Sequence, residues 1–370
     1  MLDPEPYLDR LNRLIDVEHV RSAEERQLKA WTQQPLDRLP TIISVYEDRR
    51  HVRHDWPPDW PHVGYGDAFR DPPTMLIHEL TRVYEGALLK DDRAYSIRAN
   101  YGVPILPSVL GCTYQQLGDD MPQCHSLASM DMIDNLLHKG IPDIRAGLAA
   151  KSLETEEYFL EALYPFANLR ETVRIGCPDT QGPFNLASIV AGSSIYLAIY
   201  DSPGLVSDLM ALCTSLYIAF TKAHNDLVGT KPGTSYHWGM QCRGARIVDD
   251  SAVNLSEEMY RRYVVPFNRQ IGQALGGFWG HYCGKGQQIL YAMLDTEGIT
   301  GIHFGNPEMQ TLSEVAQAVA RRGICVLWEG TLDPGDRIIR TGLIHKRTAS
   351  TWAEAETLAR GLAMETLDTT

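Results

Sequence analysis

The chain has 370 residues, of which 44% are hydrophobic, and this is enough for one α/β barrel with an extension or for two domains. The 34 Lys and Arg residues stand against 47 Asp and Glu, so the net charge is -13 at pH 7. Such a charge gives no long-range attraction to nucleic acids or anionic membranes, and we expect neither as a partner.

The sequence also lacks the marks of export. The first twenty residues are charged and contain no apolar signal core, and the apolar stretch 186–200 is interrupted by Ser and Gly. Seven cysteines, an odd number, are scattered along the chain and do not resemble a disulfide framework. We therefore expect a cytoplasmic protein with reduced cysteines.

Residues 1–95 are predicted to form an N-terminal extension packed on the main domain. Residues 2–31 place Leu8, Leu11 and Ile15 at helical intervals, which predicts a helix. Residues 48–73 are rich in Pro, Trp and charge without clear periodicity. This segment holds a basic cluster typical of a solvated loop, made of Arg49, Arg50, His51, Arg53 and His54.

Residues 96–370 alternate short apolar runs with longer helical patterns. Helices are predicted over 201–227, 255–275 and 309–323. The apolar runs are 173–179, 244–250, 276–284, 298–306, 323–330 and 340–347. Repeated alternation of strand and helix predicts a parallel sheet with helices outside. The length and the number of runs favour a closed (β/α)8 TIM barrel over an open sheet.

In such a barrel the active site forms at the C-terminal ends of the strands. The polar residues predicted at these ends are Asp179, Gln181, Asp249, Asp250, His281, Cys283, His303, Glu329 and His345. The sequence contains no Walker loop, no dinucleotide fingerprint after a strand and no Gly-x-Ser-x-Gly elbow. These absences argue against nucleotide-binding and serine-hydrolase functions.

His281 and Cys283 lie two residues apart in "GGFWGHYCGKG", so their side chains share one face of a strand. Imidazole nitrogen and thiolate sulfur are zinc ligands, and a catalytic zinc site needs three protein ligands. On its own the pair is better explained by a hydrogen-bonded histidine and a packed cysteine, since free cysteines are commonly buried. His303 and Glu329 are candidates for a further metal contact because they share the strand-end location.

Three segments resemble the uroporphyrinogen decarboxylase superfamily over roughly residues 95–367. They are "PDTQGPFNLASIVAG" (178–192), "DDSAVNLSEEMYRRYVVPFNRQI" (249–271) and "GHYCGKG" (280–286). The resemblance implies a (β/α)8 barrel with its pocket at the C-terminal ends of the strands, in agreement with the pattern of strands and helices.

The superfamily has two branches, and the sequence favours one of them. Its decarboxylases carry an N-terminal Arg-Gln-Ala-Gly-Arg segment that is absent here. Its zinc-dependent methyltransferases, which move a methyl group between a corrinoid and a thiol, carry a His-x-Cys-Gly signature that matches His281, Cys283 and Gly284. They also carry a distant Cys at the end of the last strand. The run 340–347 lacks it, and His345 or His303 is the candidate replacement.

The resemblance therefore implies a methyltransferase that uses zinc and a corrinoid. Its expected partners are a corrinoid protein or free cobalamin and a small thiol or methyl donor, and a homodimer stays an open alternative. We assign catalytic roles to Asp250 and Asp179 and substrate contacts to Gln181 and Asp249. The competing hypotheses are a cofactor-free tetrapyrrole decarboxylase, for which Arg50, Arg53 and Arg98 are the suggestive cations, and a non-catalytic barrel that binds a corrinoid or tetrapyrrole.

Overall fold

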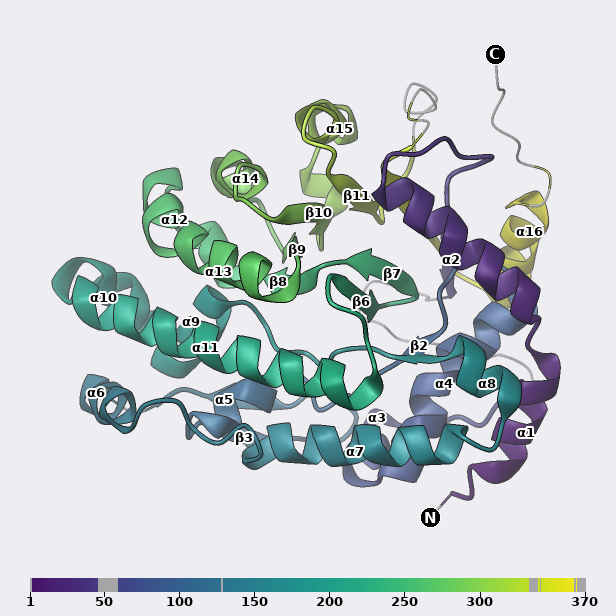
Figure 1. Cartoon of the computed structure of the whole chain (residues 1–370), viewed down its shortest axis with the longest axis horizontal. Coiled ribbons are helices and arrows are strands. Elements are labelled where there is room, and N and C mark those ends of the chain that lie inside the picture. The colour runs from purple at the N-terminus through teal and green to yellow at the C-terminus, as the bar shows by residue number, and fades with distance from the viewer. Residues whose placement is uncertain are drawn as a thin grey trace.

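A computed structural model describes residues 2–45, 59–127, 129–332, 339, 341–362 and 364. Its centre is a (β/α)8 barrel (Figure 1). The eight parallel strands follow in chain order as β1 (Thr41–Val45), β2 (Ser96–Ile97), β5 (Arg174–Ile175), β8 (Ala245–Val248), β9 (Phe278–Tyr282), β10 (Ile299–Phe304), β11 (Cys325–Trp328) and β12 (Leu343–Ala349). Six form one continuous sheet in the order β1-β12-β11-β10-β9-β8, while β2 pairs with β5. The predicted barrel is confirmed.

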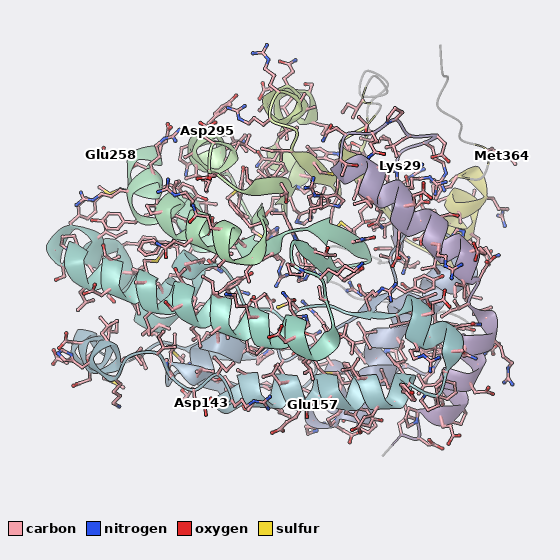
Figure 2. The ribbon with its side chains drawn as sticks, viewed as in Figure 1. Lys29, Asp143, Glu157, Glu258, Asp295 and Met364 are labelled. Atoms are coloured by element: carbon pink, nitrogen blue, oxygen red, sulfur yellow. The ribbon has the colours of Figure 1, made fainter. Side chains whose placement is uncertain are left out.

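Helices surround the strands on the outside (Figure 1). The helices that follow successive barrel strands are α4 (Pro72–Leu89), α7 (Gly147–Leu163), α11 (Pro203–Val228), α13 (Val265–Leu275), α14 (Gln287–Leu294), α15 (Leu312–Ala320) and α16 (Trp352–Leu362). Shorter helices in the connections are α3 (Tyr65–Arg70), α5 (Ile105–Val109), α6 (Met130–Lys139), α8 (Ala167–Thr172), α9 (Pro183–Ala191), α10 (Ile195–Asp201) and α12 (Glu257–Tyr263). Charged side chains such as Asp143, Glu157 and Asp295 point outward from the protein (Figure 2).

All six apolar runs identified in the sequence overlap a strand of the barrel. The helix predicted over 255–275 is instead two helices, α12 and α13, which meet at Val264. Pro266 has no backbone N–H, and it lies in the first turn of α13, where an N–H would have no partner within the helix. Within one continuous helix the same residue would remove a backbone hydrogen bond. Ser256 caps α12 by accepting a hydrogen bond from the Met259 backbone N–H.

The barrel begins earlier in the chain than predicted. Residues 2–31 form two helices, α1 (Glu5–Leu14) and α2 (Val17–Trp31), which lie outside the alternating pattern. Strand β1 also lies within the first 95 residues, yet it pairs in parallel with β12, from Thr41 opposite His345 to Val45 opposite Ala349. The predicted boundary at residue 95 is therefore wrong for the sheet. The basic cluster at residues 49–54 lies outside the described residues.

The N-terminal end of the barrel is filled by side chains from outside the eight strands. The hairpin of β6 (Thr234–His237) and β7 (Met240–Arg243) contributes Met240 and Cys242, and α2 contributes Trp31. These side chains form one buried cluster with inward-facing strand residues, including Ile42, Trp279, Cys325, Leu327 and Ile344. A second hairpin, of β3 (Thr113–Gln115) and β4 (Gln123–His125), lies outside the barrel sheet.

Among the described residues, two apolar helical segments are long enough to cross a membrane by length and composition, Pro183–Asp201 and Pro203–Val228. In the protein, 61% and 56% of their most apolar windows are buried. The apolar residues of α11, such as Leu209, Leu216 and Phe220, belong to the main hydrophobic core. Packing of these helices onto the barrel accounts for their apolar composition.

Candidate metal centre

Asp250, His281 and Cys283 converge at the C-terminal ends of two neighbouring strands. Val248 of β8 lies opposite His281 of β9, so Asp250, two residues after Val248, and Cys283, two residues after His281, reach the same edge of the sheet. Residues alternate along β9: Phe278 and Tyr282 pack in the outer core, whereas Trp279 packs inside the barrel. His281 therefore faces the interior, and Cys283 continues the same side.

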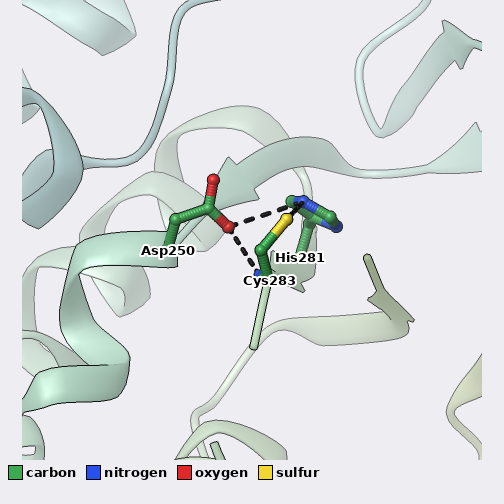
Figure 3. Close-up of side chains that lie close together, drawn as sticks. All are labelled: Asp250, His281 and Cys283. Carbon is green, nitrogen blue, oxygen red and sulfur yellow. Dashed lines mark hydrogen bonds and ion pairs between the residues drawn. The ribbon is translucent and has the colours of Figure 1, made fainter. Parts of the chain in front are cut away.

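The three side chains lie within metal-binding distance of one another (Figure 3). The distance from His281 Nε2 is 3.5 Å both to Cys283 Sγ and to Asp250 Oδ1. The backbone N–H of Cys283 donates a hydrogen bond of 2.7 Å to Asp250 Oδ1, which fixes the carboxylate in place. A Cβ atom on Gly305 would lie 2.4 Å from Cys283 Sγ, so glycine leaves room for the thiol.

The electrostatics of these three groups disfavour their charged forms. Burial, followed by the repulsion of His303 and Arg246, lowers the pKa of His281 well below its usual range. Cys283 opens to solvent, yet desolvation together with the Asp250 carboxylate raises the pKa of its thiol to about 12. Desolvation likewise raises the pKa of Asp250. Three potential metal ligands thus meet at one place where burial disfavours their charges, and a bound cation would favour the thiolate and the carboxylate.

Behind His281 lies a row of polar side chains that leads away from Cys283. His281 Nδ1 and His303 Nδ1 are 2.7 Å apart, because His303 of β10 is the direct neighbour of His281 in the sheet. His303 Nε2 lies 3.2 Å from Glu329 Oε1, and Lys346 Nζ donates a hydrogen bond of 2.6 Å to that same oxygen. His303 and Glu329 are therefore near the centre, but on the far side of His281 from Cys283.

Asp179 and Gln181 lie at the end of β5, where they are occupied by protein partners. Asp179 forms an ion pair with Arg246 of β8. The Gln181 amide donates to Asp179 at 2.6 Å and accepts from Asn185 at 2.6 Å, and its backbone holds a φ of 65°. Arg246 lies over the Trp238 ring, 5.0 Å from its centroid. These residues form a polar wall beside the three donors.

Trp238, in the turn of the β6–β7 hairpin, brings an aromatic ring to this centre. Its ring centroid lies 5.8 Å from that of His281 and 5.3 Å from that of His303. Its φ of 51° falls in the left-handed region, which a bulky residue seldom occupies. The hairpin thus carries an aromatic surface up to the base of the candidate metal centre.

Two residues predicted for the site face away from it. His345 lies between the inward-facing Ile344 and Lys346, so strand alternation turns it outward, where it bonds the carbonyl of Gly330 at 2.9 Å. Asp249 is 0% exposed and accepts hydrogen bonds from Tyr260 and Asn268 of the outer helices. Neither the Asp249 carboxylate nor the His345 imidazole reaches the interior of the barrel, because both residues lie on the outward-facing side.

Three residues near the centre were not predicted from the sequence: Arg246, Trp238 and Lys346. The alternation of β12 contained a signal for Lys346, since an inward Ile344 implies an inward residue two positions later. No comparable signal existed for Trp238, because its position depends on a hairpin entering the barrel. Arg98 follows β2 and is half-buried, whereas Arg50 and Arg53 lie outside the described residues.

Comparison with known families agrees with this architecture. The model of the uroporphyrinogen decarboxylase (URO-D) family matches residues 101–349, which is most of the chain. The protein belongs to the URO-D family. The matched region contains six of the eight barrel strands, β5 and β8 to β12, and all nine residues predicted for the site. The chain matches no curated protein sequence at a significant level.

Among solved structures, this URO-D family protein is similar to a methyltransferase from Methanosarcina mazei. The TM-score is 0.65, the sequence identity is 15%, and the similarity covers 93% of this chain and 99% of that one. At this identity the likeness establishes the shared fold. The shared arrangement extends over nearly the whole of both chains.

Proposed function

We propose that this URO-D family protein is a methyltransferase that moves a methyl group between a corrinoid and a thiol at a zinc centre. The observation that carries the proposal is the convergence of His281, Cys283 and Asp250 on one point at the C-terminal ends of β8 and β9. The fold that the chain shares with a methyltransferase from Methanosarcina mazei also supports it.

The donor set fits zinc by chemistry and by spacing. Tetrahedral zinc, with bonds of about 2.3 Å to sulfur and 2.0–2.1 Å to nitrogen or oxygen, requires its ligand atoms to be roughly 3.3–3.6 Å apart. The two distances of 3.5 Å from His281 Nε2 agree with this requirement. A nitrogen, a sulfur and a carboxylate oxygen also leave a fourth position for a reactant, as in other catalytic zinc sites.

Each residue then has a defined task. His281, Cys283 and Asp250 would hold the ion, and the Cys283 backbone N–H orients the Asp250 carboxylate. When bound, zinc supplies a lowered pKa to a coordinated thiol, so that the thiol is a nucleophile at neutral pH. Without a cation the Cys283 thiol, whose pKa is about 12, stays protonated at neutral pH. This argues against Cys283 acting alone as a nucleophile.

The methyl carrier would be a corrinoid protein or free cobalamin, and the second reactant a small thiol or methyl donor. Arg246 and Trp238 are the described side chains beside the centre that could contact such reactants. Arg246 is 3% exposed and its Nε has no hydrogen-bond partner among the described residues, so it retains one unused donor toward the interior.

The first prediction tests metal and reaction together. Protein purified without chelator should contain close to one zinc per chain, and Cys283→Ser should lose most of it because one of three protein bonds to the ion is weakened. The wild type should also transfer the methyl group from methylcobalamin to one of a panel of thiols, and the change in cobalamin absorbance measures this reaction. Cys283→Ser should leave methylcobalamin intact.

Cys124→Ser is the matched control, because Cys124 is a half-buried cysteine in β4, outside the barrel sheet. It should retain both zinc and demethylation. If the wild type instead forms coproporphyrinogen from uroporphyrinogen and leaves methylcobalamin intact, the protein is a decarboxylase. Corrinoid or tetrapyrrole binding with neither reaction would identify a non-catalytic barrel.

A further inference from the structure

We propose that Glu329 fixes the tautomer of His281 through His303, so that the free electron pair of His281 Nε2 points at Cys283 and Asp250. Glu329 and His303 are then positioning residues that act on the candidate ligand from behind. The role of this tautomer in metal binding rests on the proposed function. The tautomer itself is a property of the metal-free protein and can be measured without zinc.

The contacts form one row across four neighbouring strands, β12, β11, β10 and β9. Lys346 Nζ lies 2.6 Å from Glu329 Oε1, the same oxygen lies 3.2 Å from His303 Nε2, and His303 Nδ1 lies 2.7 Å from His281 Nδ1. The planes of the two imidazole rings differ by only 24°, which suits a hydrogen bond between ring edges. His281 and His303 are 7% and 4% exposed, so water does not replace these contacts.

The chemistry of imidazole leaves one arrangement of protons. A neutral imidazole has one N–H donor and one acceptor nitrogen. His303 Nε2 lies 3.2 Å from a carboxylate oxygen but is not aligned with it as a full hydrogen bond, and it has no other hydrogen-bond partner among the described residues. Because a carboxylate oxygen only accepts, a proton on Nε2 is favoured over an electron pair that would face the oxygen. His303 Nδ1 is then an acceptor, and the 2.7 Å contact requires the proton of His281 to be on Nδ1. His281 Nε2 is left without a proton.

The opposite arrangement would place electron pairs against each other. If His281 carried its proton on Nε2, His303 would have to donate from Nδ1 and would turn an unprotonated Nε2 toward Glu329. Lys346 makes this costly because it keeps the carboxylate ionised. Although burial opposes the charge, Lys346 and His303 hold the pKa of Glu329 well below its usual range.

This row of contacts also explains why His303 is not a third ligand. Its Nδ1 lies 2.7 Å from His281 Nδ1, which is the nitrogen on the other side of the ring from Nε2, and His303 is not part of the group whose ligand atoms converge at Asp250 and Cys283. A ligating histidine commonly donates its second N–H to an orienting group. In this protein that group is a second histidine, which in turn is oriented by a carboxylate.

The decisive experiment compares histidine tautomers in metal-free protein by ¹⁵N NMR with ¹⁵N-histidine labelling. We expect His281 with a protonated Nδ1 and an unprotonated Nε2 in the wild type. Glu329→Gln offers amide N–H groups to His303 Nε2 and should shift both histidines toward the other tautomer. Zinc affinity, measured by competition with a chromophoric chelator, should fall about 10- to 100-fold.

Two further variants separate this role from a structural one. Glu329→Gln combined with Lys346→Met removes the ammonium that would lose its partner, and it should show the same tautomer shift. His345→Gln alters a buried histidine on the outer side of β12 and should change neither the His281 tautomer nor zinc affinity. The proposal is overturned if His281 keeps its wild-type tautomer in both Glu329 variants. Failure of methyl transfer alone would contradict only the proposed function.

Discussion

Asp250 contacts both other members of the candidate metal centre, Cys283 and His281, through one carboxylate oxygen. Its Oδ1 accepts the Cys283 backbone N–H and lies 3.5 Å from His281 Nε2. Asp179, assigned a catalytic role on the same sequence grounds, is paired with Arg246. The two carboxylates therefore have different surroundings, and their substitution should have different consequences.

We predict that Asp250→Asn lowers zinc affinity by at least about tenfold, because a neutral amide oxygen replaces an anionic ligand. Asp179→Asn should retain the metal and instead free Arg246 from its ion pair. Chelator competition measures both variants under identical conditions. Equal zinc affinity in Asp250→Asn and the wild type would remove Asp250 from the ligand set.

The completely buried Asp249 gives the protein a specific pH dependence. Burial raises its pKa from 3.8 to about 6 against the opposing hydrogen bonds of Tyr260 and Asn268. The folded state thus binds the Asp249 proton more tightly than the unfolded state. The associated stability is fully present below about pH 4 and is lost as pH rises through about 6.

Asp249→Asn should therefore flatten the dependence of unfolding free energy on pH between about 4 and 7. The difference from the wild type across this range is expected to be about 3 kcal/mol at most. Urea denaturation at several pH values measures it. An unchanged pH profile would mean that Asp249 titrates normally in the folded protein.

For single residues, the sequence predicted which side chains are candidate metal ligands better than it predicted where those side chains point. His281 and Cys283 follow from residue spacing alone, because i and i+2 share a face of a strand. Asp249 and His345 were predicted to face the interior but face outward. The sequence of a short strand does not show which of its two faces is turned toward the interior of the barrel. The pairing of His281 with His303 required the register between β9 and β10, which one sequence does not contain.

Among the elements, α2 and the β6–β7 hairpin determine what fills the barrel. Trp31 of α2 packs against Gly301 of β10: a Cβ atom at Gly301 would lie 2.3 Å from the indole ring. The glycine is needed for this close approach, since Trp31 is 1% exposed and has little space to move. The helix and the strand are thus matched at one position.

Gly301→Ala should lower the free energy of unfolding by about 1–3 kcal/mol, the usual cost of adding atoms to a packed core. Gly361→Ala is the matched control in α16, where an added Cβ meets no atom within 4 Å. It should raise stability by about 0.5–1 kcal/mol, because alanine favours helix over glycine. Urea denaturation compares the two; equal effects would show that Trp31 adjusts without cost.

Six strands could be predicted because each is a short apolar run bounded by glycine or polar residues. Strands β1 and β2 were not predicted: β2 has only two residues, and β1 lies near a segment dominated by charge and proline. The hairpin that carries Trp238 was also missed. Its β6 and β7 segments are too short and too polar to show a period.

For the whole molecule, counting strands and helices was sufficient to predict a closed barrel, since few folds accommodate so many alternating units in one chain. The domain boundary was less predictable. It depends on β1 pairing with β12, and no local pattern near residue 41 identifies a partner near residue 345. The barrel closes only when the first strand, β1, pairs with the last strand, β12.

That pairing has a consequence for biosynthesis. Strand β1 leaves the ribosome early, but its neighbour β12 is made some three hundred residues later. At roughly 5–20 residues per second, β1 stays without this neighbour for about 15–60 seconds. During that time its apolar segment, "TIISV", presents an unpaired strand edge of the kind that aggregates. Newly made chains should therefore depend on chaperones more than the stability of the finished barrel would suggest.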